Sequence, residues 1–427
     1  VVFAKAFRRH VECPDAEVPG TNLRAVLDAY FDRHPVVRGY VLDDAGGVRK
    51  HVALFVDGDL ITDRSELTDP VGEHGTVHAD MSTALIGTRK GLFTLTATDG
   101  AFQLSDPAFP GVRVTNAAHD PRDGALYASL DHGHFGVHLH RSDDGGATWP
   151  EIAAPEYPPK PAGVSELNPM SQQEIEWATQ LAWIVEPGHP DEPGVLWCGT
   201  IPGGLFRSDD RGDSWQLVES LWNHPSRQKW FGGGYDDAGV HSISIDPRGP
   251  GRLVVGVSCG GAWRTDDGGA TWAIAAHGMR ADFVPPDQAD DPHHCGIFRS
   301  TDNGDRWTEI AEAGPSTFGF AVAVHPADPE TAWFVPGVSD EVRMPVDGKL
   351  VVTRTRDGGA TFDVLADGLP DGPAYDLIYR HAFDIDDTGD ELLMGSTTGS
   401  LWWTGDGGDH WHEVSSNLPP IASVRFC

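Results

Sequence analysis

One short phrase recurs six times and constrains the fold of this chain more than any other feature. Its pattern is Ser or Thr, any residue, Asp, any residue and Gly, followed by an aromatic residue three positions on. An aspartate can bond its own backbone two residues on, and a glycine takes a positive φ without steric cost. The phrase therefore predicts a tight turn between antiparallel strands, closed by a large apolar ring. Its copies occupy residues 142–149, 208–215, 265–272, 300–307, 355–362 and 404–411.

Apolar runs lead into the copies, as at Gly204–Arg207 and Gly261–Arg264, and are typical of a strand that enters a turn. The pattern resembles the BNR or Asp-box repeat of sialidases, sortilin-type receptors and a photosystem assembly factor, and this resemblance covers residues 82–427. Residues 222–225, 258–261 and 294–298 also resemble a bacterial group of Asp-box proteins without an assigned activity. The resemblance implies a β-propeller with the phrase as a structural turn, and no particular activity, because such relatives do different things.

The strands between the copies predict a mainly β fold with seven blades. Residues 82–104 supply three strands without the full phrase, and we expect residues 421–426 to complete that blade by pairing with residues 82–87. This blade and the six with the phrase make seven. However, only 35 residues (307 − 272) separate two of the closing tryptophans, whereas a four-stranded blade needs ~40–45. A six-bladed ring with an additional hairpin is therefore the alternative.

The first 78 residues lack the phrase and predict a separate, small α+β domain. Residues 21–34 are typical of a helix capped by Thr21 or Asn22, and residues 51–61 are typical of a hairpin. This stretch resembles the ubiquitin-like β-grasp sulfur carriers of the MoaD/ThiS type. That resemblance implies a C-terminal Gly-Gly, but residues 78–81 read His-Ala-Asp-Met. We therefore expect a docking role rather than sulfur transfer, unless the chain is cleaved or a segment is missing, with domains at 1–78 and 82–427.

The composition excludes some classes of partner. The chain has 31 Lys and Arg against 64 Asp and Glu, a formal net charge of -33. A surface this acidic argues against nucleic acid and anionic membranes as partners. No apolar run approaches the ~20 residues that span a bilayer. Five scattered cysteines fit a reduced protein better than a disulfide framework, so we expect a cytoplasmic location.

The loops opposite the repeated turns are the expected recognition rim. In a blade, the loop after strand three lies at the same end as the loop after strand one, so the other loops gather at the opposite end. Cys259 and His294 both stand six residues before a copy of the phrase, and His241 opens an inner strand at the same end. Residues in the long loops there are candidates for binding a ligand or a partner: His132, His134, His224, Asp236 and Asp237.

Four of these rim positions suggest a metal site. His241, Cys259, His293 and His294 carry the ligand types that zinc, iron and copper prefer, although their spacing matches no tight metal motif. In the alternative, the histidines bond loop carbonyls and Cys259 packs as a small hydrophobe. A transition metal such as zinc is thus one hypothesis for an otherwise unknown cofactor.

Arginines and carboxylates suggest a third hypothesis, a sialidase-like glycoside hydrolase. The arginines directly before the phrase recur with it, which indicates a structural role: Arg141, Arg207, Arg264, Arg299 and Arg354. Outside that register, Arg113, Arg380 and Arg425 could hold a substrate carboxylate. Tyr235, Tyr375 or Tyr379 could then act as nucleophile, with Glu174 or Glu176 as its base. The Arg-Ile-Pro motif of sialidases is absent.

The sequence thus leaves three hypotheses for function. The first is a scaffold that binds a small molecule or a protein partner at the rim opposite the Asp-box end. The second is a metal-dependent enzyme with a His/Cys site at that rim. The third is the sialidase-like glycoside hydrolase. Whether the chain is an enzyme stays open at this point.

Overall fold

The computed structural model describes most of the chain, and its regular elements are mainly strands. Its described residues are 1–3, 11–42, 46–48, 52–57, 59–61, 63, 65–72, 74–80, 83–98, 101–279 and 296–427. His293 and His294, two of the four predicted metal ligands, lie outside these ranges. Within the ranges, none of the helices combines the length and the apolar character that a bilayer span requires.

The described residues of the N-terminal part form two helices and a small sheet. Helix α2 (Leu23–Arg33) begins after Asn22, whose side chain accepts a hydrogen bond from Ala25 N at 2.9 Å, and it is followed by α3 (Pro35–Val41). Its apolar face is buried as the periodicity predicts: Leu23, Val26, Leu27, Tyr30 and Phe31. The sheet order is β1 (Val2–Phe3), β4 (Val77–Asp80), β2 (Ala53–Val56) and β3 (Asp59–Leu60), with β1 parallel to β4 and the other pairs antiparallel.

The remainder of the described chain forms six four-stranded antiparallel sheets and one two-stranded sheet. The first is ordered β30 (Ile421–Phe426), β5 (Thr83–Thr88), β6 (Gly91–Thr98), β7 (Ala101–Leu104). The next two sheets in chain order are β8 (Arg113–His119), β9 (Leu126–Asp131), β10 (Val137–Ser142), β11 (Glu151–Ile152), and then β12 (Leu181–Pro187), β13 (Leu196–Ile201), β14 (Leu205–Ser208), β15 (Gln216–Leu217). They are followed by the sheet of β16 (Val240–Ile245), β17 (Leu253–Val257), β18 (Gly261–Thr265), β19 (Ala273–Ile274), and by the two-stranded sheet of β20 (Ile297–Arg299), β21 (Thr308–Ile310). The last two sheets are β22 (Gly319–Val324), β23 (Ala332–Pro336), β24 (Val352–Thr355), β25 (Asp363–Leu365), and then β26 (Phe383–Ile385), β27 (Leu392–Gly395), β28 (Leu401–Thr404), β29 (His412–Ser415).

Short helices lie in three of the loops. Helix α4 (Glu219–Trp222) and the 3-10 turn Pro225–Lys229 lie between β15 and β16, and further 3-10 turns span Gly133–Phe135 and Val346–Gly348.

The first strands of the sheets contact one another in series around a common axis. Strand β30 lies against β8, β8 against β12, and β12 against β16, while β22 lies against β26 and β26 against β30. The two-stranded sheet β20–β21 occupies the interval of the chain between β16 and β22. This arrangement is that of a β-propeller. The number of complete blades stays a prediction, because residues 280–295, which precede β20, lie outside the described residues.

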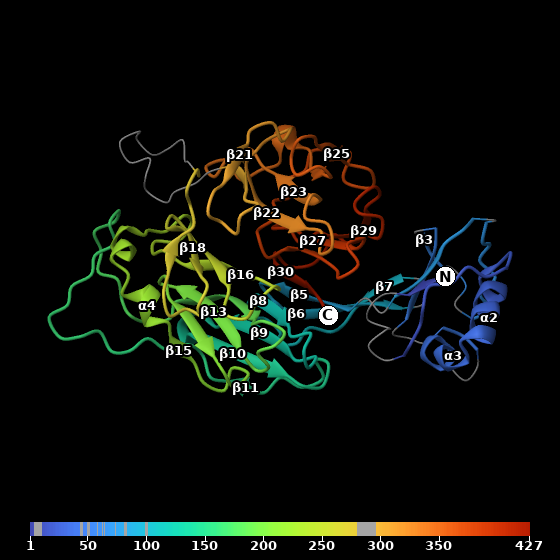
Figure 1. Cartoon of the computed structure of the whole chain (residues 1–427), viewed down its shortest axis with the longest axis horizontal. Helices are drawn as coiled ribbons and strands as arrows, with labels where there is room; N and C mark the ends of the chain where they lie inside the picture. The colour runs from blue at the N-terminus through green and yellow to red at the C-terminus, as the bar shows by residue number, and fades with distance from the viewer. Residues whose placement is uncertain are drawn as a thin grey trace.

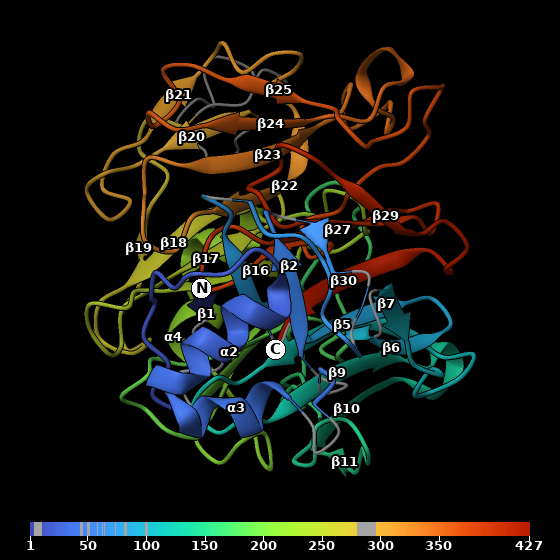
Figure 2. The same cartoon turned by 90° about the vertical axis from the view of Figure 1, so that its right-hand side faces the viewer.

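The C-terminal strand joins the first sheet. Strand β30 pairs antiparallel with β5, from Ile421 opposite Thr88 to Phe426 opposite Ala84, and Figure 1 shows β30 in red beside β5. The N-terminal part (blue) lies beyond β7 to one side of the ring in Figure 1 and stands in front of the ring in Figure 2. Phe55 of β2 stacks on Trp403 of β28 with the ring centroids 5.2 Å apart, and Phe102 of β7 contacts the same tryptophan. An apolar contact therefore joins the two parts.

The repeated phrase forms the same hydrogen-bonded turn in all six copies. The Ser or Thr hydroxyl donates to the Asp carboxylate at 2.7–2.9 Å and accepts from the glycine N–H four residues on at 2.8–3.1 Å. The same carboxylate accepts from the backbone N–H four residues beyond it at 2.8–3.0 Å, rather than two residues on as predicted. The hydroxyl and the carboxylate act as a unit, so the turn is wider than a simple aspartate turn.

Four of the arginines that directly precede the phrase connect their sheet to the next repeated turn. Arg141, Arg264, Arg299 and Arg354, which directly precede the phrase, donate through Nη1 to the backbone carbonyl of the fourth residue in the following copy, at 2.8–3.3 Å. Arg354 is almost fully buried and also pairs with Asp409 at 2.8 Å. Arg207 instead pairs with Asp209 and Glu192 of its own sheet. These arginines therefore connect neighbouring sheets at the end where the turns lie, which we call the turn end.

Replacement of a connecting arginine should destabilise the ring. Arg354→Met removes the hydrogen bond to Gly407 and the ion pair with Asp409, so we expect the free energy of unfolding to fall by about 2 kcal/mol in urea denaturation. Arg356→Met is the matched control, because Arg356 is 57% exposed and lies 3.7 Å from Asp363; its loss should be under about 0.5 kcal/mol. Equal losses in the two variants would contradict the connecting role.

The turns should also make the protein sensitive to acid. The hydrogen bond from the threonine hydroxyl four residues on lowers the pKa of Asp144, Asp267 and Asp357 to about 2. Because this folded pKa lies below the unfolded value of about 3.9, the stabilisation is present above pH 4 and is lost as the pH falls through about 2. Asp267→Asn should flatten the loss of unfolding free energy between pH 5 and pH 2. A variant with the acid dependence of the wild type would contradict this origin.

Candidate functional site

Five of the described first strands, all but β26, have a β-bulge near their beginning. The register shifts between Val114 and Asn116 in β8, between Ala182 and Ile184 in β12, and between Val240 and Ser242 in β16; β22 and β30 shift likewise. A bulge leaves one side chain outside the ladder and re-aims it. The re-aimed residues include Trp183, His241 and Phe320. Because first strands begin opposite the repeated turns, these side chains gather at one end of the ring, which we call the rim end.

Aromatic rings and arginines meet at the rim end around Trp183. The ring of Trp183 lies 5.2 Å from that of Tyr235 and 5.6 Å from that of His241, and the guanidinium carbon of Arg380 lies 5.5 Å from its centroid. We use the name rim cluster for this group together with its neighbours: Arg113, Trp183, Tyr235, Phe320, Arg343, Tyr379 and Arg380.

Arg380 stands between two aromatic residues. Its guanidinium carbon lies 5.5 Å from the centroid of Trp183 and 5.6 Å from that of Phe320. Within the described residues no hydrogen bond or ion pair joins Arg380 to a carboxylate. Burial, followed by the charge of Arg343, lowers the pKa of Arg380 to about 10. Arg380 nevertheless remains a cation at neutral pH.

Arg343 brings a second guanidinium to the rim cluster. Its Nη2 pairs with Asp340 at 2.7 Å, its Nη1 lies 3.4 Å from Tyr379 Oη, and its guanidinium carbon lies 5.5 Å from the centroid of Phe320. Arg343 belongs to the loop between β23 and β24, whereas Arg380 precedes β26. Phe320 and Tyr379, whose rings lie 5.3 Å apart, therefore hold two arginines from different sheets beside each other.

One segment of the β15–β16 connection, residues 231–239, contacts several sheets at the rim end. Tyr235 Oη accepts a hydrogen bond from Arg113 Nη2 at 3.1 Å, and a methyl group added at Gly234 would lie 3.5 Å from Arg343 Nη2. The Asp237 carboxylate accepts from Asn168 Nδ2 at 3.1 Å and from Gln180 Nε2 at 2.9 Å. The segment thus places Tyr235 over Trp183 while it is held by loops of neighbouring sheets.

The three predicted inner-strand arginines do not form one group. Arg113 and Arg380 both belong to the rim cluster, although Arg113 also pairs with Asp131 at 3.2 Å. Arg425 pairs with Glu186 near the end of β12 at 3.2 Å, and the Glu186 charge raises its pKa. Arg425 thus links the C-terminal strand to a sheet 239 residues earlier in the chain. Arg343 stands beside Arg380, and sequence reasoning missed it because a loop residue has no register with the repeat.

The predicted nucleophile and base are separated by their partners. Tyr235 Oη bonds Arg113, whereas the Glu174 carboxylate pairs with Lys160 and accepts from Ser165 Oγ at 2.8 Å. The hydrogen bond from Lys160 lowers the pKa of Glu174 to about 2. Glu176 is exposed in the same loop. The described contacts do not join Tyr235 to either glutamate.

The metal hypothesis rests on His241 and Cys259 within the described residues. His241 Nδ1 lies 2.7 Å from Ser242 Oγ, and Cys259 has a φ of 38° in the turn between β17 and β18. Burial, followed by the charge of Asp340, raises the pKa of Cys259 to about 11, so the thiol is neutral at physiological pH. In the part of the chain that the structure describes, no three His, Cys, Asp or Glu side chains are grouped to hold a metal ion. With His293 and His294 outside that part, the metal site stays a prediction.

The other predicted rim residues have local partners. His132 packs against His138 with the ring centroids 4.7 Å apart, and His134 against Phe135 at 5.7 Å. His224 Nδ1 accepts from Ser226 N at 3.2 Å and thus caps the short turn that follows. The Asp236 carbonyl accepts from Asn168 Nδ2 at 2.7 Å. Asp236 and Asp237, which both belong to residues 231–239 and both accept from Asn168, help to position the rim cluster.

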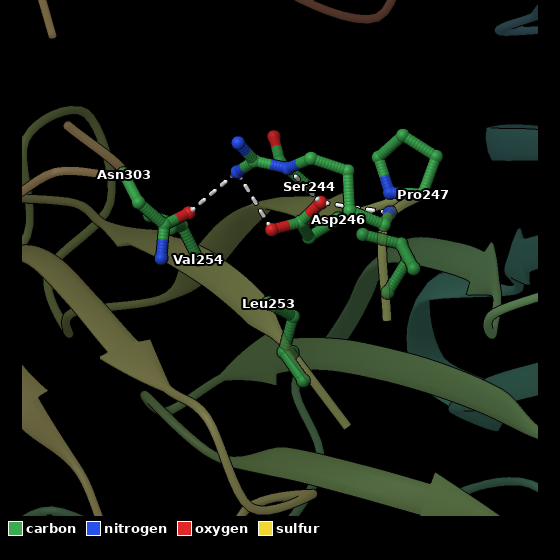
Figure 3. Close-up of a pocket in the computed structure, with 8 residues that line it drawn as sticks. Ser244, Asp246, Pro247, Leu253, Val254 and Asn303 are labelled. Carbon is green, nitrogen blue, oxygen red and sulfur yellow. Dashed lines mark hydrogen bonds and ion pairs between the residues drawn. The ribbon is translucent and has the colours of Figure 1, made fainter. Parts of the chain in front are cut away.

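A surface pocket of about 260 Å³ lies at the turn end, between the end of β16, the start of β17 and Asn303 (Figure 3). Arg248 spans it, with Nε and Nη2 each 2.8 Å from the Asp246 carboxylate and Nη2 3.4 Å from Asn303 Oδ1. Because its charged groups pair with one another, this pocket leaves no charge for a ligand. The rim cluster is therefore the better candidate site.

Comparisons with known proteins identify the fold. No model of a known protein family matches the chain. A probable oligoxyloglucan-reducing end-specific xyloglucanase of Neosartorya fischeri is 31% identical over 132 residues, which is 31% of this chain and 13% of that protein. The GH74 xyloglucanase of Xanthomonas campestris superposes with a TM-score of 0.53 at 19% identity, over 78% of this chain and 52% of that chain. YCF48 bound to D1 peptide matches with a TM-score of 0.45 at 16% identity, over 84% and 95%.

The likeness to the solved xyloglucanase of Xanthomonas campestris confirms a β-propeller. The chain spans about half of the solved xyloglucanase and a small part of the curated one, so neither transfers its activity to this chain.

Replacement of Arg425, which is paired with a carboxylate, and of Arg380, which is not, should change the stability of the protein differently. Arg425→Met leaves Glu186 without its partner, and because both side chains are partly exposed we expect a loss of about 2 kcal/mol in the free energy of unfolding. Arg380→Met removes a desolvated cation without a carboxylate partner, so its melting temperature should equal or exceed that of the wild type. A destabilised Arg380→Met protein beside an unaffected Arg425→Met protein would reverse this assignment.

Proposed function

We propose that this chain is a ligand-binding β-propeller that holds a carbohydrate at the rim cluster. The observation that carries the proposal is the convergence of Trp183, Tyr235 and Phe320, from two bulged strands and one loop, at the end of the ring opposite the repeated turns. Binding sites typically combine an aromatic lining with a few convergent polar groups. The arginines of the rim cluster and the hydroxyls of Tyr235 and Tyr379 supply such groups.

Aromatic surfaces suit a sugar as the ligand. The C–H face of a sugar ring packs on an indole or phenol ring, while its hydroxyls reach charged groups at the ring edge. Tyr235 is 40% exposed, and two further aromatic residues in rim-end loops are more so: Tyr375 at 64% and Phe135 at 80%. Exposed apolar surface gathered in one region commonly marks a contact surface. The partial sequence likeness to an enzyme named for oligoxyloglucan supports the same ligand class.

The N-terminal part fits a docking role. We propose that residues 1–78 form the β-grasp domain, because a parallel pair β1–β4 beside an antiparallel β2 is the centre of such a sheet. The stacking of Phe55 on Trp403 supports attachment to the propeller rather than independent action. The cytoplasmic location and the absence of nucleic acid and membrane partners stay predictions from the composition.

Loss of an aromatic ring should weaken sugar binding. Isothermal titration with an oligoxyloglucan mixture is expected to show an increase of about tenfold in Kd for Trp183→Ala and for Tyr235→Ala, about 1.4 kcal/mol, as for buried aromatic anchors. Tyr40→Ala is the matched control, because Tyr40 is 39% exposed on α3, outside the propeller, and its Kd should stay within twofold. A wild-type protein without affinity for the sugars, or a Tyr40 variant as weak as the other two, would contradict the proposal.

A glycoside hydrolase is the second candidate, and the likeness to xyloglucanases favours it. Release of reducing ends from the same oligoxyloglucans, absent in heat-unfolded protein, would establish turnover. Tyr235→Phe then tests the nucleophile hypothesis, since it keeps the ring over Trp183 but removes the hydroxyl. Complete loss of turnover with unchanged sugar affinity would support Tyr235 as nucleophile; full turnover would exclude it. Binding without turnover would leave the scaffold function alone.

A further inference from the structure

We infer that the ligand of the rim cluster carries an acidic group, a carboxylate or a sulfate ester, and that Arg343 and Arg380 bind it. This inference rests on the proposed function, because it specifies the class of sugar that the same site takes. The carboxylate and the sulfate ester share the chemistry that the site recognises, an anion with planar or tripodal oxygens. The experiment below distinguishes them.

The first observation is that Arg380 lacks an anionic partner in a strongly acidic chain. The protein has 64 acidic against 31 basic residues, and other buried arginines are paired: Arg122 with Asp120, Arg354 with Asp409 and Arg425 with Glu186. A half-buried cation costs free energy unless it is paired. Within the described residues Arg380 lies against aromatic rings and forms no ion pair; the Asp340 charge also acts on it, but that carboxylate is paired with Arg343. An anion supplied from solution would compensate its charge.

The second observation is that the aromatic rings beside Arg380 leave its guanidinium N–H groups available for a ligand. Trp183 and Phe320 both lie within 6 Å of the Arg380 guanidinium, and cation–π contacts cover the charge without using its N–H groups. Arginine presents five N–H donors in a fixed fork, and none of those on Arg380 is engaged by the described residues. The fork can therefore donate two parallel hydrogen bonds to one carboxylate or sulfate.

The third observation is the second cation beside the first. Arg343 uses Nη2 for Asp340 and Nη1 for a long contact with Tyr379. Both guanidinium groups lie within 6 Å of the Phe320 centroid. Burial and then the charge of Arg343 lower the pKa of Arg380, and the Asp340 charge offsets this only in part. An anion between the two guanidinium groups would remove the repulsion between them, so the pair is arranged for a charged ligand rather than a neutral one.

Titrations with three sugars of similar size test the inference: D-glucose, D-glucuronate and glucose 6-sulfate. The wild type should bind one or both acidic sugars at least tenfold more tightly than glucose. Arg380→Met, which keeps an apolar side chain between Trp183 and Phe320, should lose this preference, so that it binds the acidic sugars no more tightly than glucose. Arg380→Lys should fall between them, because it keeps the charge but lacks the fork. Arg248→Met, at the turn end, is the control and should match the wild type.

The outcomes separate this inference from the proposed function. Equal affinity of the wild type for all three sugars overturns the acidic group and leaves the carbohydrate site standing. An unchanged preference in Arg380→Met also overturns the assignment. If no sugar binds but inorganic sulfate binds and requires Arg380, the anion site stands and the carbohydrate proposal fails. If sulfate also fails to bind, both are wrong. A stronger response to glucuronate than to the sulfate ester identifies the carboxylate as the group recognised.

Discussion

The hydrogen bond from an arginine to the next repeated turn is the contact on which the ring depends. Inside each turn, a hydroxyl and a carboxylate satisfy the local N–H groups, but the carbonyl of the fourth residue points outward. An arginine of the preceding sheet donates to that carbonyl in four cases, so the turn is at once a local cap and a contact between sheets. The repeat therefore specifies each blade and also its neighbour.

The two ends of the ring therefore have different roles: the turn end stabilises the fold, and the rim end carries the candidate binding site. At the turn end the charges are paired with one another, as in the pocket at Arg248 and Asp246. At the rim end the bulges interrupt the ladders and re-aim Trp183 and Phe320, and Arg380 has no carboxylate partner in the described chain. Strand ladders tolerate a bulge at their end at little cost because neighbouring pairs continue beyond it. The ring can thus vary its rim while the turn end holds it together.

The sequence predicted the features that follow a local or repeated pattern, but not those that tertiary packing determines. The six turns, the buried face of α2 and the pairing of β30 with β5 follow from local pattern, since each depends on residues that are close in sequence or on the need to cover a sheet edge. Arg425 looked equivalent to Arg380 because both stand near inner strands, but a partner 239 residues away makes Arg425 structural. Arg343 and the bulges gave no signal, because loop length and register shifts are set by tertiary packing.

The most informative feature of the rim cluster is that the charge of Arg380 has no ion-pair partner in the described chain. Natural proteins retain a destabilising group mainly where function requires it. Arg380 is half-buried between rings that cannot neutralise it, and Arg343 adds a like charge beside it. In a chain with a net charge of -33, the one carboxylate that acts clearly on Arg380, Asp340, is paired with Arg343, and no described carboxylate forms an ion pair with Arg380. A neutral ligand would leave the two neighbouring positive charges uncompensated, whereas an anionic ligand would compensate them and would bind more tightly for that reason.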